Sequence, residues 1–172
     1  SPGLAGAIGT LNVNGTYTQA VNSFYNVNVN ATGGPGASDL VNVTGAANIN
    51  GGTVRVTAAI GSYNPTTVYT ILTSTGARTG TFSGVTSNFA FLDPALTYDP
   101  NNVFLTLTRN SIDFASVGIT PNQISAGGGL AALGMANPIV AAALMLTPDQ
   151  ARAAFDSLSG EIHPSLHSLM LD

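Results

Sequence analysis

Apolar and polar positions alternate in short runs along much of the chain. Leu11 and Val13 stand at every second position, and Val27 and Val29 repeat the pattern. The alternation returns at Val41, Val43, Val54, Val56, Leu105 and Leu107. Period-two alternation is typical of half-buried strands, whose successive side chains point to opposite faces. The sequence therefore predicts many short strands between residues 9 and 109, with these apolar side chains pointing into a core.

Turn-forming residues separate these runs. The breaks lie at Asn14-Gly15, Gly33-Gly34-Pro35-Gly36, Asn50-Gly51-Gly52, Asn64-Pro65 and Asp99-Pro100. Glycine, proline and asparagine favour turns because each suits backbone angles that strands do not use. Many short strands with frequent turns fit a sandwich, a barrel or a β-solenoid.

Imperfect repeats favour the solenoid among these three folds. Residues 11–15 read Leu-Asn-Val-Asn-Gly and are echoed by Ala-Asn-Ile-Asn-Gly at 47–51, while Val-Asn-Val occurs at both 27–29 and 41–43. A solenoid tolerates irregular spacing because each coil contacts only its neighbours. At about 20–25 residues per coil, the region supplies about four coils. The predicted fold is mainly β, with residues 1–120 forming a right-handed parallel β-helix (solenoid) stem.

Helical patterns replace the strands after residue 120. Gly127, Gly128 and Gly129 disfavour a helix through their stretch, since each glycine costs about 1 kcal/mol relative to alanine. The Ala-rich segment 138–146 has helical propensity. Thr147 then begins a new helix, with Pro148 in the first turn and Gln150 completing a capping box.

An apolar stripe continues from this helix start toward the end of the chain. It comprises Ala151, Phe155, Leu158, Ile162, Leu166 and Leu169, at spacings of three and four. Such spacing places apolar side chains on one helix face. Gly160 and Pro164 interrupt the stripe, which predicts a bend between two short helices. Residues 121–172 are therefore predicted to form a C-terminal α-helical linker.

Charge and cysteine content exclude several classes of protein. Charged residues make up 7% of the 172 residues, lysine is absent, and the net charge is -4. No basic patch is available to hold nucleic acid or to dock on anionic lipid. The longest apolar run, 139–146, is too short to span a bilayer. The absence of cysteine excludes disulfides, thiolate metal sites and a cysteine nucleophile.

Two motifs come close to metal sites. Residues 33–40 resemble a calcium-binding glycine-aspartate nonapeptide, but Asp39 stands one residue late and no tandem copy follows, so a turn is expected. His163 and His167 are four residues apart with Glu161 nearby, but a third strong ligand at useful spacing is missing. We expect neither a metal nor a cofactor.

Catalytic constellations are not evident. Two carboxylates can share acid-base work in enzymes that cleave polysaccharides. The acids of the strand region are far apart in sequence and are predicted to form turns: Asp39, Asp93, Asp99 and Asp113. A Gly-x-Ser-x-Gly nucleophile motif does not occur. The expectation is a protein that is not an enzyme.

The C-terminal part resembles a known family. Residues 151–163 resemble the segment that joins passenger to barrel in bacterial autotransporters, the proteins of type V secretion. The motif residues are Phe155, Leu158, Ser159, Gly160, Glu161, Ile162 and His163. Upstream, residues 38–45 resemble a passenger coil, and 69–72 with 80–82 resemble the terminal stem. Residues 96–98 and 103–107 resemble the strand pair that closes that stem. Pro164 departs from the family, where alanine is common.

The resemblance implies a structural and secretory role. This segment would be an autochaperone that folds first and templates the passenger upstream during translocation, leaving the passenger displayed on the surface of a Gram-negative bacterium after export through the periplasm. The implied partners are the protein's own C-terminal outer-membrane β-barrel, which the sequence does not contain, and the upstream passenger β-helix. The barrel-assembly machinery and a host surface are further implied partners. The opening Ser1-Pro2-Gly3, without methionine, suggests a piece of a longer precursor.

A binding role is the alternative hypothesis. In it, the β-helical face itself is an adhesin module that attaches to host molecules. Adhesion needs an exposed aromatic or charged patch. The clustered aromatic candidates are Tyr17, Phe24, Tyr25 and Tyr63.

Overall fold

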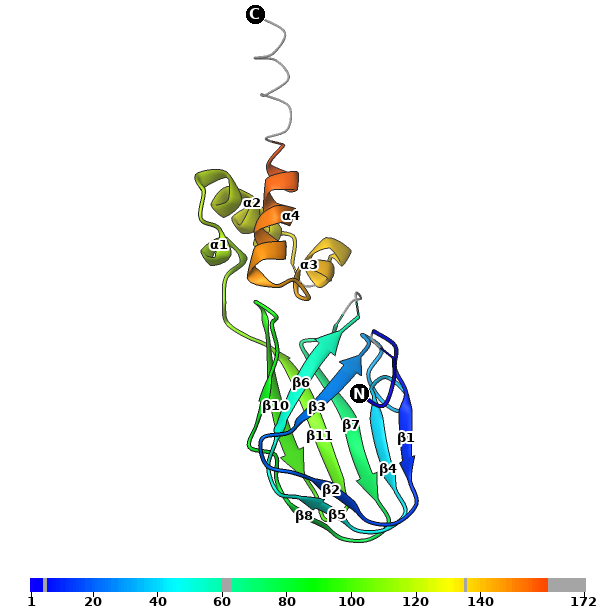
Figure 1. The fold of residues 1–172 in the computed structure, drawn as a ribbon. Coiled ribbons are helices and arrows are strands. Elements are labelled where there is room, and N and C mark those ends of the chain that lie inside the picture. The colour runs from blue at the N-terminus through cyan, green and yellow to red at the C-terminus, as the bar shows by residue number, and fades with distance from the viewer. Residues whose placement is uncertain (5, 60–62, 135, 161–172) are drawn as a thin grey trace, which may run out of the picture. The chain divides into compact units, whose positions relative to one another are not determined.

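The fold divides into two compact units. The computed structural model describes residues 1–4, 6–59, 63–134 and 136–160. The strand unit comprises Ser1–Asn88 and Leu92–Arg109. The helical unit comprises the described residues from Asn110 to Gly160 together with Phe89–Phe91, a short stretch between β9 and β10 (Figure 1).

The strand unit contains three sheets. Its strands are β1 Thr10–Val13, β2 Tyr17–Gln19, β3 Phe24–Val29, β4 Leu40–Val43, β5 Ala47–Ile49, β6 Thr53–Ala58, β7 Thr66–Ser74, β8 Arg78–Gly80, β9 Gly84–Thr86, β10 Leu92–Tyr98 and β11 Asn102–Arg109. The largest sheet has the order β1-β4-β7-β11-β10, and the smaller two are β2-β5-β8 and β3-β6-β9 (Figure 1). The first nine strands thus visit the three sheets in rotation.

From β4 to β9, each strand pairs in parallel with the strand three places earlier in the chain. Thr10 pairs with Leu40, and Tyr17 pairs with Ala47, an offset of 30 residues in each case. The arrangement changes after β7, where β11 pairs antiparallel with both β7 and β10. The strand pair expected near 96–98 and 103–107 is therefore present as β10 and β11.

The turns that contain Gly15, Gly45 and Gly76 stack on one another, so that the backbone of each turn contacts the backbone of the next. A Cβ atom built on Gly45 would lie 2.6 Å from the carbonyl oxygen of Gly15, and one on Gly76 would lie 2.8 Å from the carbonyl carbon of Gly45. Real Cβ atoms do not approach that closely. Glycine is required at Gly45 and Gly76 because successive turns lie directly over one another.

Aliphatic and tyrosine side chains fill the interior of the strand unit. The predicted core residues Val41, Val43, Val54, Val56, Leu105 and Leu107 are all buried, as are Val27 and Val29. Leu11 is 46% exposed, and Val13 is partly exposed. The prediction that Leu11 points into the core is wrong, because β1 is the outermost strand of its sheet and has a neighbour on one side only.

The helical unit contains α1 Phe114–Val117, α2 Pro121–Ala132, α3 Pro138–Ala143 and α4 Pro148–Ser159. Its apolar core joins residues from all four helices with the strand-derived stretch: Ala90, Phe91, Phe114, Leu130, Val140, Ala143, Leu144, Ala151 and Phe155. The backbone of the stretch is held within the same unit, since Ala90 N donates to Leu146 O (2.9 Å) and Asn110 N donates to Phe91 O (3.1 Å).

Helix α2 runs through the glycine triplet that was expected to disfavour it. Thr120 accepts from Gln123 N, and the Gln123 side chain accepts from Thr120 N, which is a complete capping box with proline in the first turn. Gly127 packs where no side chain fits, since a Cβ there would lie 2.8 Å from the backbone of Phe114 and of Ala115. Tertiary packing against α1 thus overrides the low helix propensity of glycine.

The predicted fold class is wrong. The chain was expected to be a mainly β, right-handed parallel β-helix with a C-terminal helical linker. It is a mixed α/β protein with separate sheets of five, three and three strands, the largest ending in an antiparallel pair. The helices are not a linker, because they enclose a core of their own. The sequence patterns located the elements, but they did not reveal that the helices and Phe89–Phe91 bury one another's apolar side chains.

Candidate functional site

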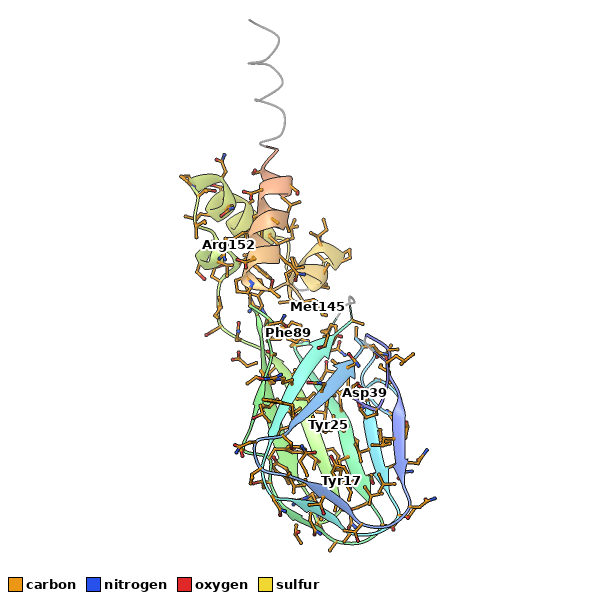
Figure 2. All side chains as sticks on the ribbon, in the orientation of Figure 1. Tyr17, Tyr25, Asp39, Phe89, Met145 and Arg152 are labelled. Carbon is orange, nitrogen blue, oxygen red and sulfur yellow. The ribbon has the colours of Figure 1, made fainter. Side chains whose placement is uncertain are left out.

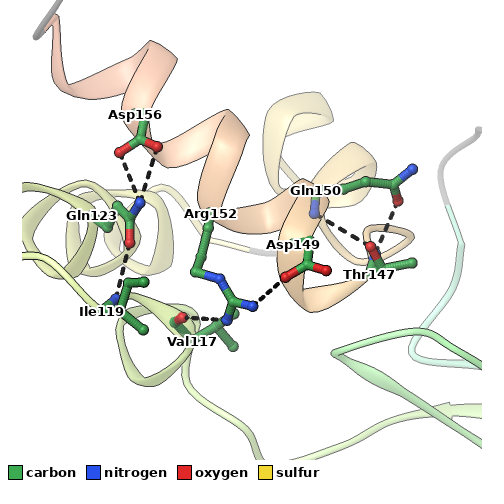
Figure 3. Close-up of polar contacts among 8 residues, drawn as sticks. All are labelled: Val117, Ile119, Gln123, Thr147, Asp149, Gln150, Arg152 and Asp156. Atoms are coloured by element: carbon green, nitrogen blue, oxygen red, sulfur yellow. Dashed lines mark hydrogen bonds and ion pairs between the residues drawn. The ribbon is translucent and has the colours of Figure 1, made fainter.

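Helix α4 carries the described part of the family-like motif, so the candidate site is built around it. The helix begins as predicted: Thr147 accepts from Gln150 N at 3.3 Å, and the Gln150 side chain accepts from Thr147 N at 3.0 Å (Figure 3). Asp149 in the first turn suits the positive end of the helix dipole. Helix α4 ends at Gly160, whose φ of 75° favours glycine, so the predicted interruption at that residue is confirmed.

The inner face of α4 is apolar and closed. Ala151 and Phe155 are both fully buried, and both belong to the core that contains Phe91 and Phe114. Phe155 is thus a structural anchor of the helical unit. Burial of a phenylalanine side chain stabilises a fold by about 1.5–3 kcal/mol relative to leaving it exposed.

A polar clamp, made of Gln123, Arg152 and Asp156, ties α4 to the first two helices of its unit. Gln123 Nε2 donates to both carboxylate oxygens of Asp156, at 2.8 and 3.0 Å, while Gln123 Oε1 accepts from Ile119 N at 2.9 Å (Figure 3). Arg152 donates to the carbonyl of Val117 at 3.3 Å and pairs with Asp149. Gln123 is buried and satisfied on both ends of its amide.

The outer face of α4 is apolar and open. Leu158 is 53% exposed and lines an apolar groove together with Ala126, Gly129, Leu130, Leu133 and Ile139. Ser159 is partly exposed, and its hydroxyl donates to Asp156 O. The motif residues Glu161, Ile162 and His163, and the proposed His163/His167 pair, lie outside the described residues.

Asp39 has a structural role in the strand unit. Its side chain is fully buried and accepts from Gly9 N (2.7 Å), from Asn28 N (2.9 Å) and from Asn28 Nδ2 (2.9 Å). Ser1 Oγ donates to the same carboxylate at 2.7 Å. These donors use the oxygens that a metal would need, so Asp39 joins the first residues of the chain to β3 rather than forming a simple turn.

The other three acids lie apart from Asp39. Asp99 sits in the turn after β10 and accepts from Asn101 N and Asn102 N, and Asp113 caps α1. Asp93 belongs to β10, so its assignment as a turn former is wrong. Within the described ranges, His, Asp and Glu do not gather in a group of three that could hold a metal ion.

The four aromatic candidates do not form a surface patch. Tyr25 and Tyr63 are buried, and their hydroxyls donate to the carbonyls of Ile71 and Ala59. Burial raises the pKa of both tyrosines well above the usual range. Tyr17 is partly buried and bonds to Gln19. Tyr17 and Tyr25 both belong to the strand unit (Figure 2).

Phe24 is the exposed member of that set, at 53% exposure. The Arg55 guanidinium stacks over its ring at 3.4 Å from the centroid, a cation–π contact that connects β3 to β6.

Comparisons with known proteins add no family. The chain matches no protein-family model, and it matches no curated protein. Of the helices in the described part of the chain, none is long and apolar enough to cross a membrane.

Proposed function

We propose that this chain is a secretory and folding module of a bacterial autotransporter, exported through the periplasm to the cell surface. It lies between an upstream passenger and a downstream outer-membrane barrel, and it nucleates folding of the passenger during translocation. The motif from Phe155 through Gly160, continued in sequence by Glu161, Ile162 and His163, supports this proposal. The barrel and the barrel-assembly machinery are its proposed partners.

The observation that carries the proposal is the asymmetry of the sheet edges. Strands β1, β2 and β3 each form one edge of a sheet, and among the described residues each is paired on one side only. These three strands are the first in the chain. Their free backbone groups can pair with strands that precede them in a longer polypeptide.

Two of the opposite edge strands, β8 and β10, are less open to pairing. The turn between β10 and β11 bonds to the first residue of β8 and to the last residue of β7. Arg78 N donates to Pro100 O (2.7 Å), and Ser74 N donates to Asn101 O (2.9 Å). The edge strand β10 contains Pro94, which has no N–H to donate to a neighbour. Strand addition is therefore favoured toward the upstream side.

An ordered sheet edge stabilises the strands that fold next against it. If one added repeat of three strands buries three inward aliphatic side chains, that burial contributes about 5–9 kcal/mol. Ordering the backbone costs about 1–2 kcal/mol per residue, and the parallel strands here repeat every 30 residues. A single repeat would therefore be unstable alone. Contact with an ordered sheet edge supplies the hydrogen bonds and the burial that a single repeat lacks.

The adhesin alternative has less support. Tyr25 and Tyr63 are buried, and the exposed ring of Phe24 is already stacked by Arg55. A contiguous aromatic patch, which adhesion through this face would need, is not formed by the four candidates.

A pair of neighbouring substitutions on β11 tests the proposal. In cells that make the complete precursor, Leu107→Asp places a charge in the core, whereas Thr108→Asp places the same charge on an exposed position. We expect Leu107→Asp to reduce the surface level and the protease resistance of the passenger, with Thr108→Asp close to the natural protein. Measuring total precursor in parallel separates failed export from low expression. A normal, protease-resistant passenger in the Leu107→Asp strain would overturn the autochaperone role.

A further inference from the structure

Two turns of the strand unit contain asparagine followed by glycine. Their sequences are Val13-Asn14-Gly15 and Ile49-Asn50-Gly51, so a β-branched aliphatic residue precedes the asparagine in both. Asparagine is a chemically labile residue, and a glycine after it leaves the next backbone nitrogen unhindered by a side chain. The two turns therefore share nearly the same intrinsic reactivity, and a difference between them must come from the fold.

The turn at Asn14 lies at the end of a stack of turns. Asn14 and Gly15 are both exposed. A Cβ built on Gly15 would meet nothing within 4 Å, and the stack continues on its other side, where Gly45 packs against the Gly15 carbonyl. Gly15 N donates to Thr44 Oγ1 at 3.1 Å, an exposed bond that water can replace. The backbone of this turn can therefore change its conformation without opening the strand unit.

The turn at Asn50 is held on both sides. Gly51 is buried, and a Cβ built on it would lie 3.0 Å from Ser83 Oγ and 3.5 Å from Val21 Cγ1. Asn50 N donates to Gln19 O at 2.9 Å, which ties the turn to the preceding sheet strand. A change of backbone conformation here requires local unfolding, which has a free-energy cost.

We propose that Asn14 is a site of spontaneous deamidation, because its turn is free to bring the Gly15 nitrogen onto the Asn14 side chain. The nitrogen attacks Cγ of Asn14, and the new bond closes a succinimide ring. The bond from Cγ to Nδ2 breaks, and Nδ2 leaves as ammonia with the proton that the Gly15 nitrogen gives up. Water then opens the ring at either carbonyl, which yields aspartate or isoaspartate. The inference does not depend on the proposed function.

The product changes the open edge of the largest sheet. Residues 1–38 contain no charged side chain, so the new carboxylate is the first along the chain. It directly follows β1, the outermost strand of its sheet. Charge at an edge strand disfavours the addition of a further strand. Deamidation thus converts a neutral sheet edge into a charged one.

The test compares the two asparagines within one molecule. The purified full chain is incubated in mildly alkaline buffer, and mass spectrometry follows the acid form at each site over time. Chymotrypsin separates the sites for this measurement, because Tyr17, Phe24 and Tyr25 lie between them. The same chain in concentrated urea is the control, since both sites should react at one rate once the fold is lost.

We expect Asn14 in the folded chain to deamidate on the order of ten times faster than Asn50, which must first open locally. Aspartate and isoaspartate should both form at Asn14, since the ring opens on either side. Equal rates at the two sites in the folded chain, or a faster rate at Asn50, would overturn the proposal. Aspartate as the sole product at Asn14 would also overturn it, because direct hydrolysis of the amide does not pass through the ring.

Asn14→Thr is the matched variant. Threonine stands at the corresponding places of the next two turns, Thr44 and Thr75, so it suits the fold. The variant should show no mass gain in the peptide that contains residue 14, and its rate at Asn50 should stay as in the natural chain. A mass gain that persists in that peptide would place the reaction at Asn12 and overturn the assignment.

Discussion

Phe91 and Phe114 meet edge to face, with ring centroids 4.6 Å apart and ring planes at 63°. Phe114 opens α1, but Phe91 lies between β9 and β10, so one ring comes from a helix and the other from the connection between two strands. Both are buried in the core that also contains Phe155. The helical unit is therefore assembled from two separate stretches of the chain, and a residue outside the helices completes its interior.

Phe91→Ala should destabilise the helical unit by about 3–5 kcal/mol, the usual cost of removing a buried aromatic side chain. The edge-to-face contact with Phe114 contributes part of that loss. The measurement is urea unfolding followed by far-ultraviolet circular dichroism. Phe24→Ala is the control, since Phe24 is 53% exposed and should cost much less. Equal losses in the two variants would show that Phe91 is not a core residue of the helices.

Gly127→Ala and Gly128→Ala should change stability in opposite directions. In an open helix position, alanine stabilises by about 1 kcal/mol relative to glycine. A Cβ on Gly128 meets nothing within 4 Å, so that gain should appear. A Cβ on Gly127 would lie 2.8 Å from the backbone of Phe114, and the contact between α1 and α2 must then open. The urea midpoint should rise for Gly128→Ala and fall for Gly127→Ala; a rise in both would mean that the two helices are not in contact at Gly127.

Local sequence signals predicted the elements better than their assembly. The alternating runs located the strands, and the Thr147–Gln150 capping box located α4, because period and capping are properties of neighbouring residues. Thr120 and Gln123 carry the same capping signal. That signal predicts the start of α2, against the low helix propensity of the three glycines that follow it.

Long-range features were not predictable in the same way. Whether Gly127 disfavours a helix depends on α1 lying against it, and the place of Phe91 depends on helices that begin more than twenty residues later. Leu11 alternates like a core residue but lies on an edge strand, and strand order cannot be read from periodicity. An apolar groove is likewise formed by residues of three helices, and of these residues the spacing pattern assigns only Leu158 to an apolar helix face.

Asp39→Ala should destabilise the strand unit by about 1–3 kcal/mol. The substitution leaves the buried N–H of Asn28 and the N–H of Gly9 without their acceptor, and unsatisfied buried donors carry a desolvation cost. Hydrogen exchange at these two amides should accelerate together. Asp113→Ala is the control, since Asp113 is exposed and lies in the other unit. Unchanged exchange at Gly9 would contradict the linking role of Asp39.

The carboxyl group of Asp99 should titrate below its usual value of about 3.9. Hydrogen bonds from the Asn102 side chain and from the Asn101 and Asn102 amides hold its pKa down. A depressed pKa in the folded state means a contribution to stability that is present at neutral pH and is lost as pH falls through the folded-state pKa. Titration by nuclear magnetic resonance should show the pKa rising in Asn102→Ala. An unchanged value would exclude the side-chain bond as the main cause.

Phe155→Ser and Leu158→Ser should separate folding from function in the α4 motif. Phe155 is fully buried, so its loss should cost about 3–5 kcal/mol and reduce helix content. Leu158 is half exposed, and its replacement should cost about 1 kcal/mol or less. Circular dichroism and urea unfolding measure both effects in the chain itself.

Surface display of the complete precursor is then compared at equal expression. Under the proposed function, Phe155→Ser should lower display because the helical unit no longer folds. If Leu158→Ser lowers display equally while stability is retained, the exposed face of α4 contacts a partner during export; normal display of both variants would exclude α4 from secretion.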